Sequence, residues 1–189
     1  VYGMQDQLPI RETAPIHPIS AYGVDKYACE QHAAVAQIVH QIPTFGMRFF
    51  NVYGPRQDPF SPYSGVISIF MRAITSGNPI ALFGDGEQSR DFVFVDDVAE
   101  SLIRAMNTLQ TGAVTHAITN ICTGIRTSIR ELAEQIGQAA HKPISIHHAP
   151  AREGDIRHSQ GSTEHANSLL GFAPTTSIRE GLAKTLMYM

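Results

Sequence analysis

The chain contains 189 residues, of which 43% are hydrophobic, and it carries a formal net charge of −3. This length and composition suffice for one sizeable hydrophobic core. Charged residues are scattered without a basic run, which argues against a nucleic-acid-binding face and leaves only local anion binding by a few arginines. No apolar run approaches the roughly 20 residues of a membrane span, so we expect a cytoplasmic protein without membrane contact.

Cysteine and histidine usage argues against a disulfide framework and a metal site. The two cysteines, Cys29 and Cys122, are expected to be reduced, buried thiols. The nine histidines include the adjacent His147 and His148, whose side chains would point to opposite faces of a strand. No cysteine or carboxylate joins them at a ligand spacing, so we predict that no metal is bound.

The first half of the chain predicts helices and strands in alternation. A helix is expected over 22–41, closed by Pro43. Its apolar residues recur at helical spacing: Val24, Tyr27, Ala28, Val35, Ile38 and Val39. The nearly continuous apolar run at 44–53 is typical of a strand buried on both faces of a parallel sheet. A loop at 57–65 then precedes a helix at 66–75, whose apolar residues on one face are Val66, Ile67, Phe70 and Ile74.

Two short strands are expected next, at 79–83 and 92–95, separated by the turn Gly84-Asp-Gly86. Asp96 and Asp97 suit the first turn of a helix that runs to about residue 106, because carboxylates are stabilised by the positive end of the helix dipole. We prefer this structural role for both aspartates to a metal-binding or catalytic one.

The last third continues the alternation. Strands are expected at 117–122 and 144–148, and helices at about 129–140 and 163–170, the second ending at Gly171. Capping boxes are predicted at 128–131 and 177–180, each with serine at the N-cap and glutamate three residues later. The shared string Thr-Ser-Ile-Arg-Glu reflects this repeated cap, since nothing around it recurs at a fixed period.

Tyr22 and Lys26 are the residues that most directly suggest chemistry. They are four residues apart, so a helix places both side chains on one face. A cation held beside a phenol favours the phenolate and moves the phenol pKa from about 10 towards the range of a general base. Such a pair can take a proton from an alcohol or sugar hydroxyl. The alternative is a solvated lysine beside a half-buried tyrosine.

Five sequence blocks support the chemical reading, because they occur in the order found in one family and span almost the whole chain. The blocks are Val1-Tyr-Gly; Ser20-Ala-Tyr22-Gly-Val-Asp-Lys26; Arg48-Phe-Phe-Asn51-Val-Tyr-Gly-Pro-Arg56-Gln-Asp-Pro; Phe83-Gly-Asp-Gly-Glu-Gln-Ser-Arg90-Asp-Phe-Val-Phe-Val-Asp-Asp97; and Arg152-Glu-Gly-Asp155-Ile-Arg-His-Ser159. In these blocks the chain resembles the extended short-chain dehydrogenase/reductases, specifically their NAD-dependent nucleotide-sugar epimerase/dehydratase branch.

The resemblance implies an α/β fold: the C-terminal part of an NAD(P)-binding Rossmann-like fold with a smaller α/β substrate-binding domain. The Gly-rich turn that lets backbone approach a pyrophosphate does not occur in the chain. We therefore expect a C-terminal portion of the family's architecture. Residues 1–56 are expected to be a remnant of the NAD-binding domain, and 57–189 mainly the nucleotide-sugar-binding domain. The segment at about 88–122 is expected to return to the Rossmann domain.

The resemblance also implies NAD as cofactor. In the family, the tyrosine that matches Tyr22 is the catalytic acid/base, and the lysine that matches Lys26 holds the nicotinamide ribose. Both would contact the cofactor, together with Phe49. A serine or threonine completes the family's catalytic set just before the Val-Tyr-Gly block, ahead of Val1, so we expect this chain by itself to be inactive.

Four polar residues match the family's substrate site. Asn51 resembles its substrate-binding asparagine, with a turn-forming asparagine as the alternative. Arg90 and Arg152 match two arginines that clamp the diphosphate of a nucleotide sugar, for which guanidinium groups are suited. Asp155 matches the carboxylate that accepts hydrogen bonds from the nucleotide ribose. The alternative for the arginines is surface ion pairing with their sequence neighbours, Asp91 or Glu153.

Two further positions concern the base and the sugar. Phe83 aligns with an aromatic residue near the uracil ring, although it can equally be a core residue. Ser159 aligns with the position that limits space beside the C2 substituent of the sugar. A small side chain there suggests room for an N-acetyl group.

The resemblance favours epimerisation at C4 of a UDP-hexose or UDP-N-acetylhexosamine. A nucleotide-sugar 4,6-dehydratase or decarboxylase shares the first oxidation and is the nearest alternative. A non-catalytic nucleotide-sugar-binding remnant is the alternative from another class. The resemblance also implies a homodimer through the Ala-rich helix at 22–41 and its neighbouring helix, although core burial in a monomer explains the small residues equally well.

Overall fold

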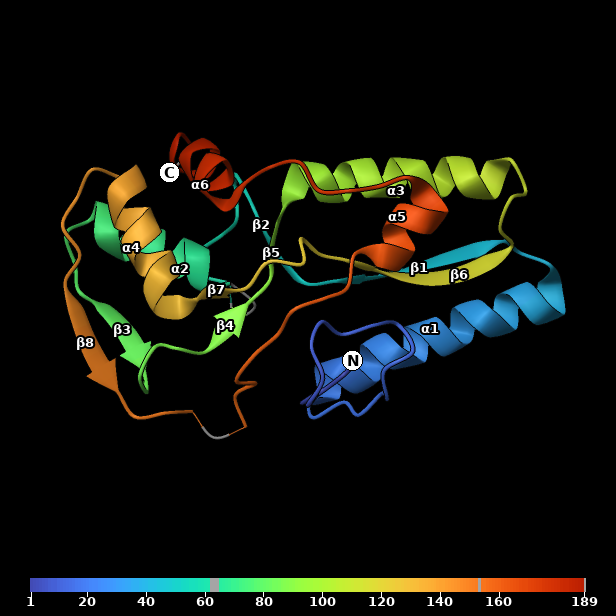
Figure 1. Ribbon diagram of the computed structural model, residues 1–189, viewed down its shortest axis with the longest axis horizontal. Coiled ribbons are helices and arrows are strands. Elements are labelled where there is room, and N and C mark those ends of the chain that lie inside the picture. The colour runs from blue at the N-terminus through green and yellow to red at the C-terminus, as the bar shows by residue number, and fades with distance from the viewer. Residues whose placement is uncertain (62–64, 153, 189) are drawn as a thin grey trace.

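The structure, a computed structural model, describes residues 1–61, 65–152 and 154–188. Most of its elements form two groups that lie side by side along the longest axis (Figure 1). The first group contains α1 (Ala21–His40), β1 (Thr44–Phe49), α3 (Val95–Gln110), β6 (His116–Ile121) and α5 (Glu164–Leu170). The second group contains α2 (Val66–Thr75), β3 (Ile80–Phe83), α4 (Ile129–Ala139), β8 (Ile146–Ala149) and α6 (Ile178–Leu186). Helices alternate with parallel strands, which confirms the α/β class.

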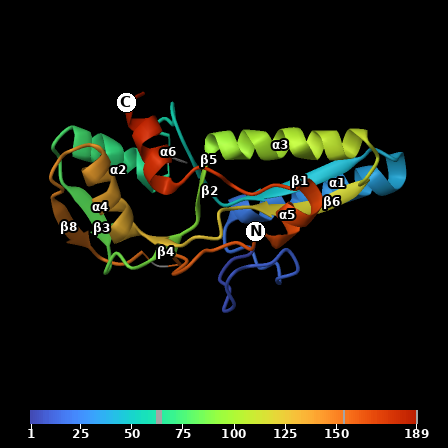
Figure 2. The same ribbon diagram turned by 45° about the horizontal axis from the view of Figure 1, so that its top comes forward.

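In the first group, β1 and β6 pair in parallel, with Thr44 opposite His116 and Phe49 opposite Ile121. Helix α1 lies along one face of this pair, and α3 with α5 covers the other (Figures 1 and 2). The core of this group lies under α3 and α5 and includes the buried Ile121 and Leu170. On the opposite face of the pair, α1 has no fully buried apolar side chain.

In the second group, β3 and β8 pair in parallel, with Ile80 opposite Ile146. Helix α2 packs on β3, α4 on α2, and α6 on α4 and β5, and together these elements enclose the larger core. Of the residues predicted on one apolar face of the helix at 66–75, Ile67, Phe70 and Ile74 are buried in this core, and Val66 is partly buried against it. Leu182 of α6 is also fully buried in this core, so the last helix is part of it.

Short strands connect the two groups. β2 (Asn51–Tyr53) pairs in parallel with β5 (Phe92–Phe94), and β4 (Ser89–Arg90) pairs antiparallel with β7 (Thr127–Ser128). Successive side chains of a strand point to opposite faces. The side chain of Phe94 accordingly enters the core of the second group, whereas that of Val93 enters the core of the first.

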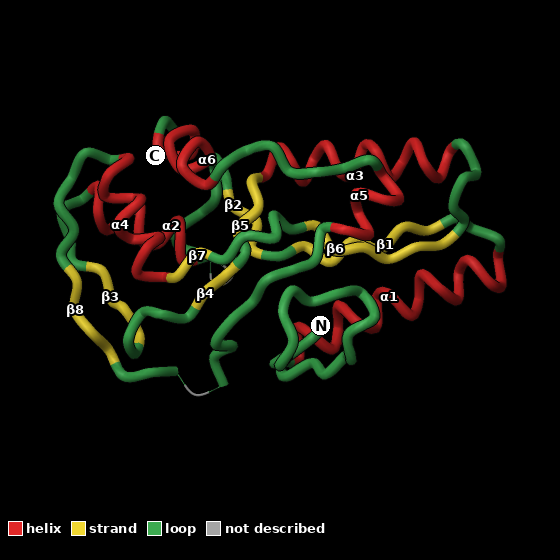
Figure 3. The backbone as a smooth tube through the Cα atoms, viewed as in Figure 1, coloured by secondary structure: helices red, strands yellow, loops and turns green. Residues whose placement is uncertain are grey.

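The single buried strand predicted at 44–53 is wrong in two respects. The strand is interrupted at Phe50. The N–H of Phe50 donates to the carbonyl of Ile121 at 3.0 Å, whereas the N–H of Asn51 donates to the carbonyl of Asp91 at 2.9 Å. The segment thus changes its partner strand from β6 to β5, as the tube in Figure 3 shows. β1 is also only half-buried, and the side chain of Phe49 at its end is exposed.

The predicted helix at 22–41 is present, but its apolar residues are not buried. Val24, Val35, Ile38 and Val39 are all exposed, and Gly23 is the only buried residue of α1. The same helix exposes Cys29, which corrects the prediction of a buried thiol, whereas Cys122 is buried as predicted. Helical spacing establishes that a face is apolar, but it does not say what covers that face.

The helix N-termini follow the predicted capping in part. Ser177 and Glu180 form the full reciprocal capping box at the start of α6. At α4, Ser128 accepts from the N–H of Glu131, but the Glu131 side chain turns to Gln135 instead of closing the box. The prediction is therefore right for α6 and only half right for α4.

Candidate active site

A cavity of about 840 Å³ brings together most of the predicted substrate-binding residues. Those that line it are Asn51, Phe83, Arg90, Arg152 and Asp155. They come from different parts of the chain: Asn51 begins β2, Phe83 ends β3, Arg90 ends β4, and the other two lie in the segment after β8. The remaining wall is formed largely by α2 and β3.

Arg90 and Asp155 face each other in this cavity. The Arg90 guanidinium forms an ion pair with the Asp155 carboxylate and also donates to the carbonyls of Ser89 and Ile156. The sequence alternative, a surface pair of Arg90 with Asp91, is wrong because the Asp91 side chain is fully buried and bonded elsewhere. Glu153, the alternative partner of Arg152, lies outside the described residues.

Phe83 and Arg152 form a second pair. The guanidinium carbon of Arg152 lies 3.8 Å from the centroid of the Phe83 ring, which is a cation–π contact. Phe83 is therefore half-exposed at the cavity and is not a plain core residue.

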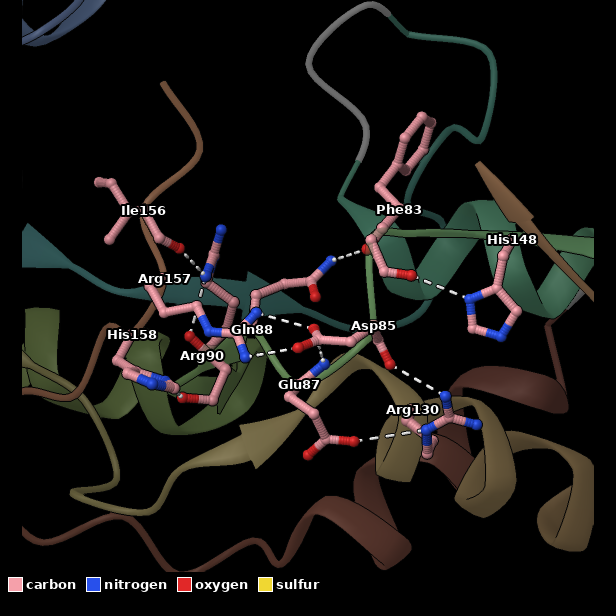
Figure 4. A network of polar contacts seen from close by, with 12 residues as sticks. Phe83, Asp85, Glu87, Gln88, Arg90, Arg130, His148, Ile156, Arg157 and His158 are labelled. Carbon is pink, nitrogen blue, oxygen red and sulfur yellow. Dashed lines mark hydrogen bonds and ion pairs between the residues drawn. The ribbon is translucent and has the colours of Figure 1, made fainter. Parts of the chain in front are cut away.

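The segment at 155–159 is tied to the β3–β4 turn by several contacts (Figure 4). Arg157 forms a bidentate ion pair with Asp85, with both N–O distances 2.7 Å, and this pairing holds the pKa of Asp85 well below its usual range. Ser89 contacts the imidazole of His158 at 2.8 Å and accepts from the N–H of Ser159. Burial, followed by the charges of nearby arginines, lowers the pKa of His158. These contacts fix the position of Asp155 opposite Arg90.

Four predicted site residues are not among those that line the cavity. Tyr22 and Lys26 lie on the first two turns of α1, where the Lys26 ammonium is 5.4 Å from the centroid of the Tyr22 ring, so the two share one face as predicted. Tyr22 and Phe49 have exposed side chains, and Ser159 is held by its backbone beside Ser89. The roles assigned to these four residues stay predictions.

Asp91 lies behind the cavity and supports it, a role not predicted from the sequence. Its carboxylate accepts four hydrogen bonds, from the N–H and hydroxyl of Thr123 and the N–H groups of Gly124 and Gly161. Burial raises its pKa, against the effect of these bonds. Its backbone carbonyl accepts from the N–H of Asn51. Asp91 is thus linked to two residues that line the cavity: Arg90, its neighbour in the chain, and Asn51, through this bond. An aspartate between Arg90 and the apolar run that begins at Phe92 offers no local signal of such long-range partners.

The charge of the cavity wall favours an anion. Among the described residues that line it, three arginines face a single acidic side chain: Arg72, Arg90 and Arg152 against Asp155. Guanidinium groups bind the paired oxygens of phosphates well. Within residues 1–61, 65–152 and 154–188, no group of three or more His, Cys, Asp or Glu side chains is arranged to hold a metal ion. No helix in that part of the chain is long and apolar enough to cross a bilayer.

The fold and the cavity thus define an α/β protein with an anion-attracting cavity beside its short parallel strands. The chain belongs to the NAD dependent epimerase/dehydratase family, whose model matches residues 1–122. It is 36% identical to the UDP-glucose 4-epimerase of Mycolicibacterium smegmatis over 188 residues, which is 100% of this chain and 58% of that protein.

Solved structures agree with this assignment. The UDP-N-acetylglucosamine 4-epimerase of Methanobrevibacter ruminantium, in complex with UDP-N-acetylmuramic acid, superposes with a TM-score of 0.92 at 31% identity, covering 100% of this chain and 59% of that one. The UDP-glucose 4-epimerase of Thermotoga maritima, with UDP-glucose, has a TM-score of 0.92 at 34% identity, covering 99% and 59%. The chain therefore spans somewhat under three fifths of the length of these relatives.

Proposed function

We propose that this chain forms the nucleotide-sugar-binding part of an NAD-dependent 4-epimerase acting on a UDP-hexose or UDP-N-acetylhexosamine. The observation that carries the proposal is the convergence of Asn51, Phe83, Arg90, Arg152 and Asp155 on one arginine-rich cavity. Family membership and similarity to proteins named as UDP-sugar 4-epimerases support it.

Each cavity residue would bind a different part of the nucleotide sugar. Arg90 and Arg152 would bind the diphosphate, since guanidinium groups are suited to its paired oxygens. Asp155 would accept from the ribose hydroxyls, and Phe83 would pack against the base. Asn51 would donate its amide to the diphosphate or base. Because Arg90 and Asp155 contact each other, they would bind adjoining parts of the ligand, the diphosphate and the ribose.

The reaction requires a base at the C4 hydroxyl. Tyr22, with Lys26 beside it, would take the C4 hydroxyl proton and later return it, while Lys26 also holds the nicotinamide ribose. NAD, when bound, supplies the hydride acceptor and donor. Its fit to the described residues rests on Tyr22, Lys26 and Phe49, whose side chains lie at the start of α1 and the end of β1. With the proton on Tyr22 and the hydride on the cofactor, the sugar would be a 4-keto intermediate, and return of both to the opposite face would invert C4.

The sugar specificity and the oligomeric state are the finer parts of the proposal. Ser159 is small, which would leave room for a C2 N-acetyl group. The exposed apolar residues of α1, among them Val35, Ile38 and Val39, support burial of this helix against a second copy of the protein. We also propose the domain division at residue 56, with a return of the segment 88–122.

The decisive experiment follows C4 inversion by proton NMR. The chain, expressed with whatever natural sequence flanks it, is incubated with NAD⁺ and either UDP-N-acetylglucosamine or UDP-glucose. The galacto epimer is expected, and Tyr22→Phe should abolish it, whereas Tyr188→Phe, which changes another exposed tyrosine, should not. A stable 4-keto product, or decarboxylation of UDP-glucuronate, would instead indicate a dehydratase or decarboxylase. Nucleotide-sugar binding without turnover would indicate a non-catalytic binder.

A binding measurement tests the cavity separately from the chemistry. Titration calorimetry with UDP is compared for the wild type, Arg90→Lys and Arg152→Lys. Loss of a charge-assisted hydrogen bond costs about 1.5–3 kcal/mol, which corresponds to roughly 10- to 150-fold weaker binding. Arg104→Lys on the exposed face of α3 is the control and should bind normally. Unchanged affinity in both cavity variants would refute the assignment of the diphosphate site.

A further inference from the structure

Helix α1 carries Tyr22 and Lys26 but has little apolar contact with the rest of the chain. Gly23 is its only buried residue, and its large apolar side chains are mostly exposed. Within the described chain, polar contacts therefore contribute most to fixing its rotation and its register along β1. In the part of the chain that the structure describes, the strongest link is an ion pair between the helix and the strand.

This ion pair joins Arg48 of β1 to Glu30 of α1. Nε and Nη2 of Arg48 donate to the two carboxylate oxygens of Glu30, each at 2.8 Å. Both side chains are almost completely removed from solvent, with exposed fractions of 9% and 10%. A bidentate pair in such surroundings fixes both distance and orientation, because each N–H has only one acceptor direction.

Glu30 lies on the same side of the helix as the proposed catalytic pair. It follows Lys26 by four residues and Tyr22 by eight, and residues at this spacing stack along one helix face. The Arg48–Glu30 pair therefore sets the direction in which Tyr22 and Lys26 point. A rotation of α1 that broke this pair would move all three side chains together.

The third guanidinium nitrogen of Arg48, Nη1, contacts the N-terminal segment of the chain. Nη1 donates to the Tyr2 hydroxyl at 2.8 Å and to the carbonyl of Glu12 at 3.1 Å, and the guanidinium lies over the Tyr2 ring. The Tyr2 hydroxyl in turn donates to the side-chain oxygen of Asn120 at 2.6 Å. Burial raises the pKa of Tyr2, which keeps this hydroxyl protonated as a donor. One guanidinium thus contacts α1 and residues 2 and 12 directly, and β6 through Tyr2.

We infer that Arg48 is a positioning residue for the proposed epimerase: through Glu30 and Tyr2, it fixes the Tyr22–Lys26 face of α1 against β1 and the segment around Tyr2. The inference rests on the proposed function for its effect on turnover. Arg48 acts through other residues and is not a member of the cavity, so it should affect the catalytic step more than nucleotide-sugar binding.

The test compares Arg48→Lys with the wild type by kinetics and by hydrogen–deuterium exchange. Lysine keeps the charge but cannot make the two parallel bonds to Glu30. We expect kcat to fall by roughly 10- to 100-fold, since small misplacements of catalytic groups have effects of this size, while KM for the UDP-sugar changes by less than about threefold. Amide exchange should accelerate over 21–40 and stay unchanged in α2 and α4.

Two further variants keep the test decisive. If Arg48→Lys does not fold, Glu30→Gln removes the ion pair with almost no change in shape and should show the same pattern. Arg104→Lys disrupts contacts of Arg104 with Glu100 on α3 and with the carbonyls of Leu170 and Gly171, all remote from α1, and should change neither kcat nor exchange in α1.

The outcomes separate this inference from the proposed function. Unchanged kcat and unchanged amide exchange in the Arg48 or Glu30 variant overturn the positioning role of Arg48. A loss of activity accompanied by a uniform rise in amide exchange over the whole protein overturns it as well. If the wild type itself does not invert C4, the proposed function fails. In that case, faster amide exchange confined to α1 in the Arg48 variant would still support the role of Arg48 in holding α1 in place. Unchanged exchange in α1 would overturn that role.

Discussion

Replacement of Asp91 by alanine should destabilise the protein more than removal of any exposed carboxylate. Asp91 has no solvent-exposed surface, and it accepts bonds from Thr123, Gly124 and Gly161. These donors belong to the segments that follow β6 and precede α5. Alanine leaves three backbone N–H groups without their acceptor, because only the threonine hydroxyl can turn to another partner.

The size of the effect follows from these contacts. A buried donor without a partner costs about 1–3 kcal/mol, so three of them give roughly 3–9 kcal/mol. Burial raises the pKa of Asp91, so desolvation of its charge already offsets part of the benefit in the wild type. We therefore expect the low end, about 3–5 kcal/mol, as for other buried charges whose partner is removed.

Thermal unfolding measures this loss. For chains of about this size, 1 kcal/mol shifts the melting temperature by about 2–4 °C, so the expected fall is about 6–20 °C. UDP affinity should fall as well, because loss of the carboxylate bonds loosens the backbone at residue 91, which follows Arg90 and whose carbonyl accepts from the N–H of Asn51. Urea unfolding provides an independent estimate of the free energy.

Asp96→Ala is the matched control. Asp96 is exposed in the first turn of α3, where its interaction with the helix dipole contributes at most about 1 kcal/mol. If Asp91→Ala loses no more stability than Asp96→Ala, the four bonds do not anchor the site, and the reasoning is wrong.

Three other predictions concern stability. Gly181→Ala should destabilise the folded protein by about 1–3 kcal/mol, because the new methyl group would meet the Tyr53 ring. Alanine usually favours a helix, so a higher urea midpoint in this variant would contradict the prediction. The folded-state pKa of His158 is lowered, so the unfolded chain binds a proton first, near pH 6.5, and stability should fall as pH drops below that value. Melting temperatures from pH 7.5 to 5 test this, and His158→Gln should show a shallower slope if the assignment holds. Ser177→Ala should cost about 1 kcal/mol or slightly more, and Ser128→Ala less, because only Ser177 has the reciprocal box; equal losses in urea would count against the difference.

Local sequence patterns predicted most elements of the fold. Spacing of apolar residues located the helix at 66–75 and its buried face, and serine with glutamate three residues later located the start of α6. The resemblance placed Arg90 and Asp155 in one site although they are far apart in the chain, and the structure brings them into contact.

Features that depend on distant partners could not be predicted in this way. The break at Phe50 arises because β1 and β2 pair with different strands, and no residue between 44 and 53 signals that change. The exposure of Val35 and Ile38 depends on what lies opposite α1. The partners of Asp91 and the Arg48–Glu30 pair likewise appear only when separate segments meet.

The order in which the chain visits the two groups has a consequence for its synthesis. It enters the second group at α2 and β3, returns to the first for α3 and β6, crosses again for α4 and β8, and places α5 in the first before α6 completes the second. β3 must wait for β8 as its partner, and the core around β3 must wait for Leu182. A ribosome-bound chain therefore exposes the apolar face of α2 at least until α4, the helix that packs against it, has emerged. Chaperone binding to nascent chains should accordingly concentrate on α2.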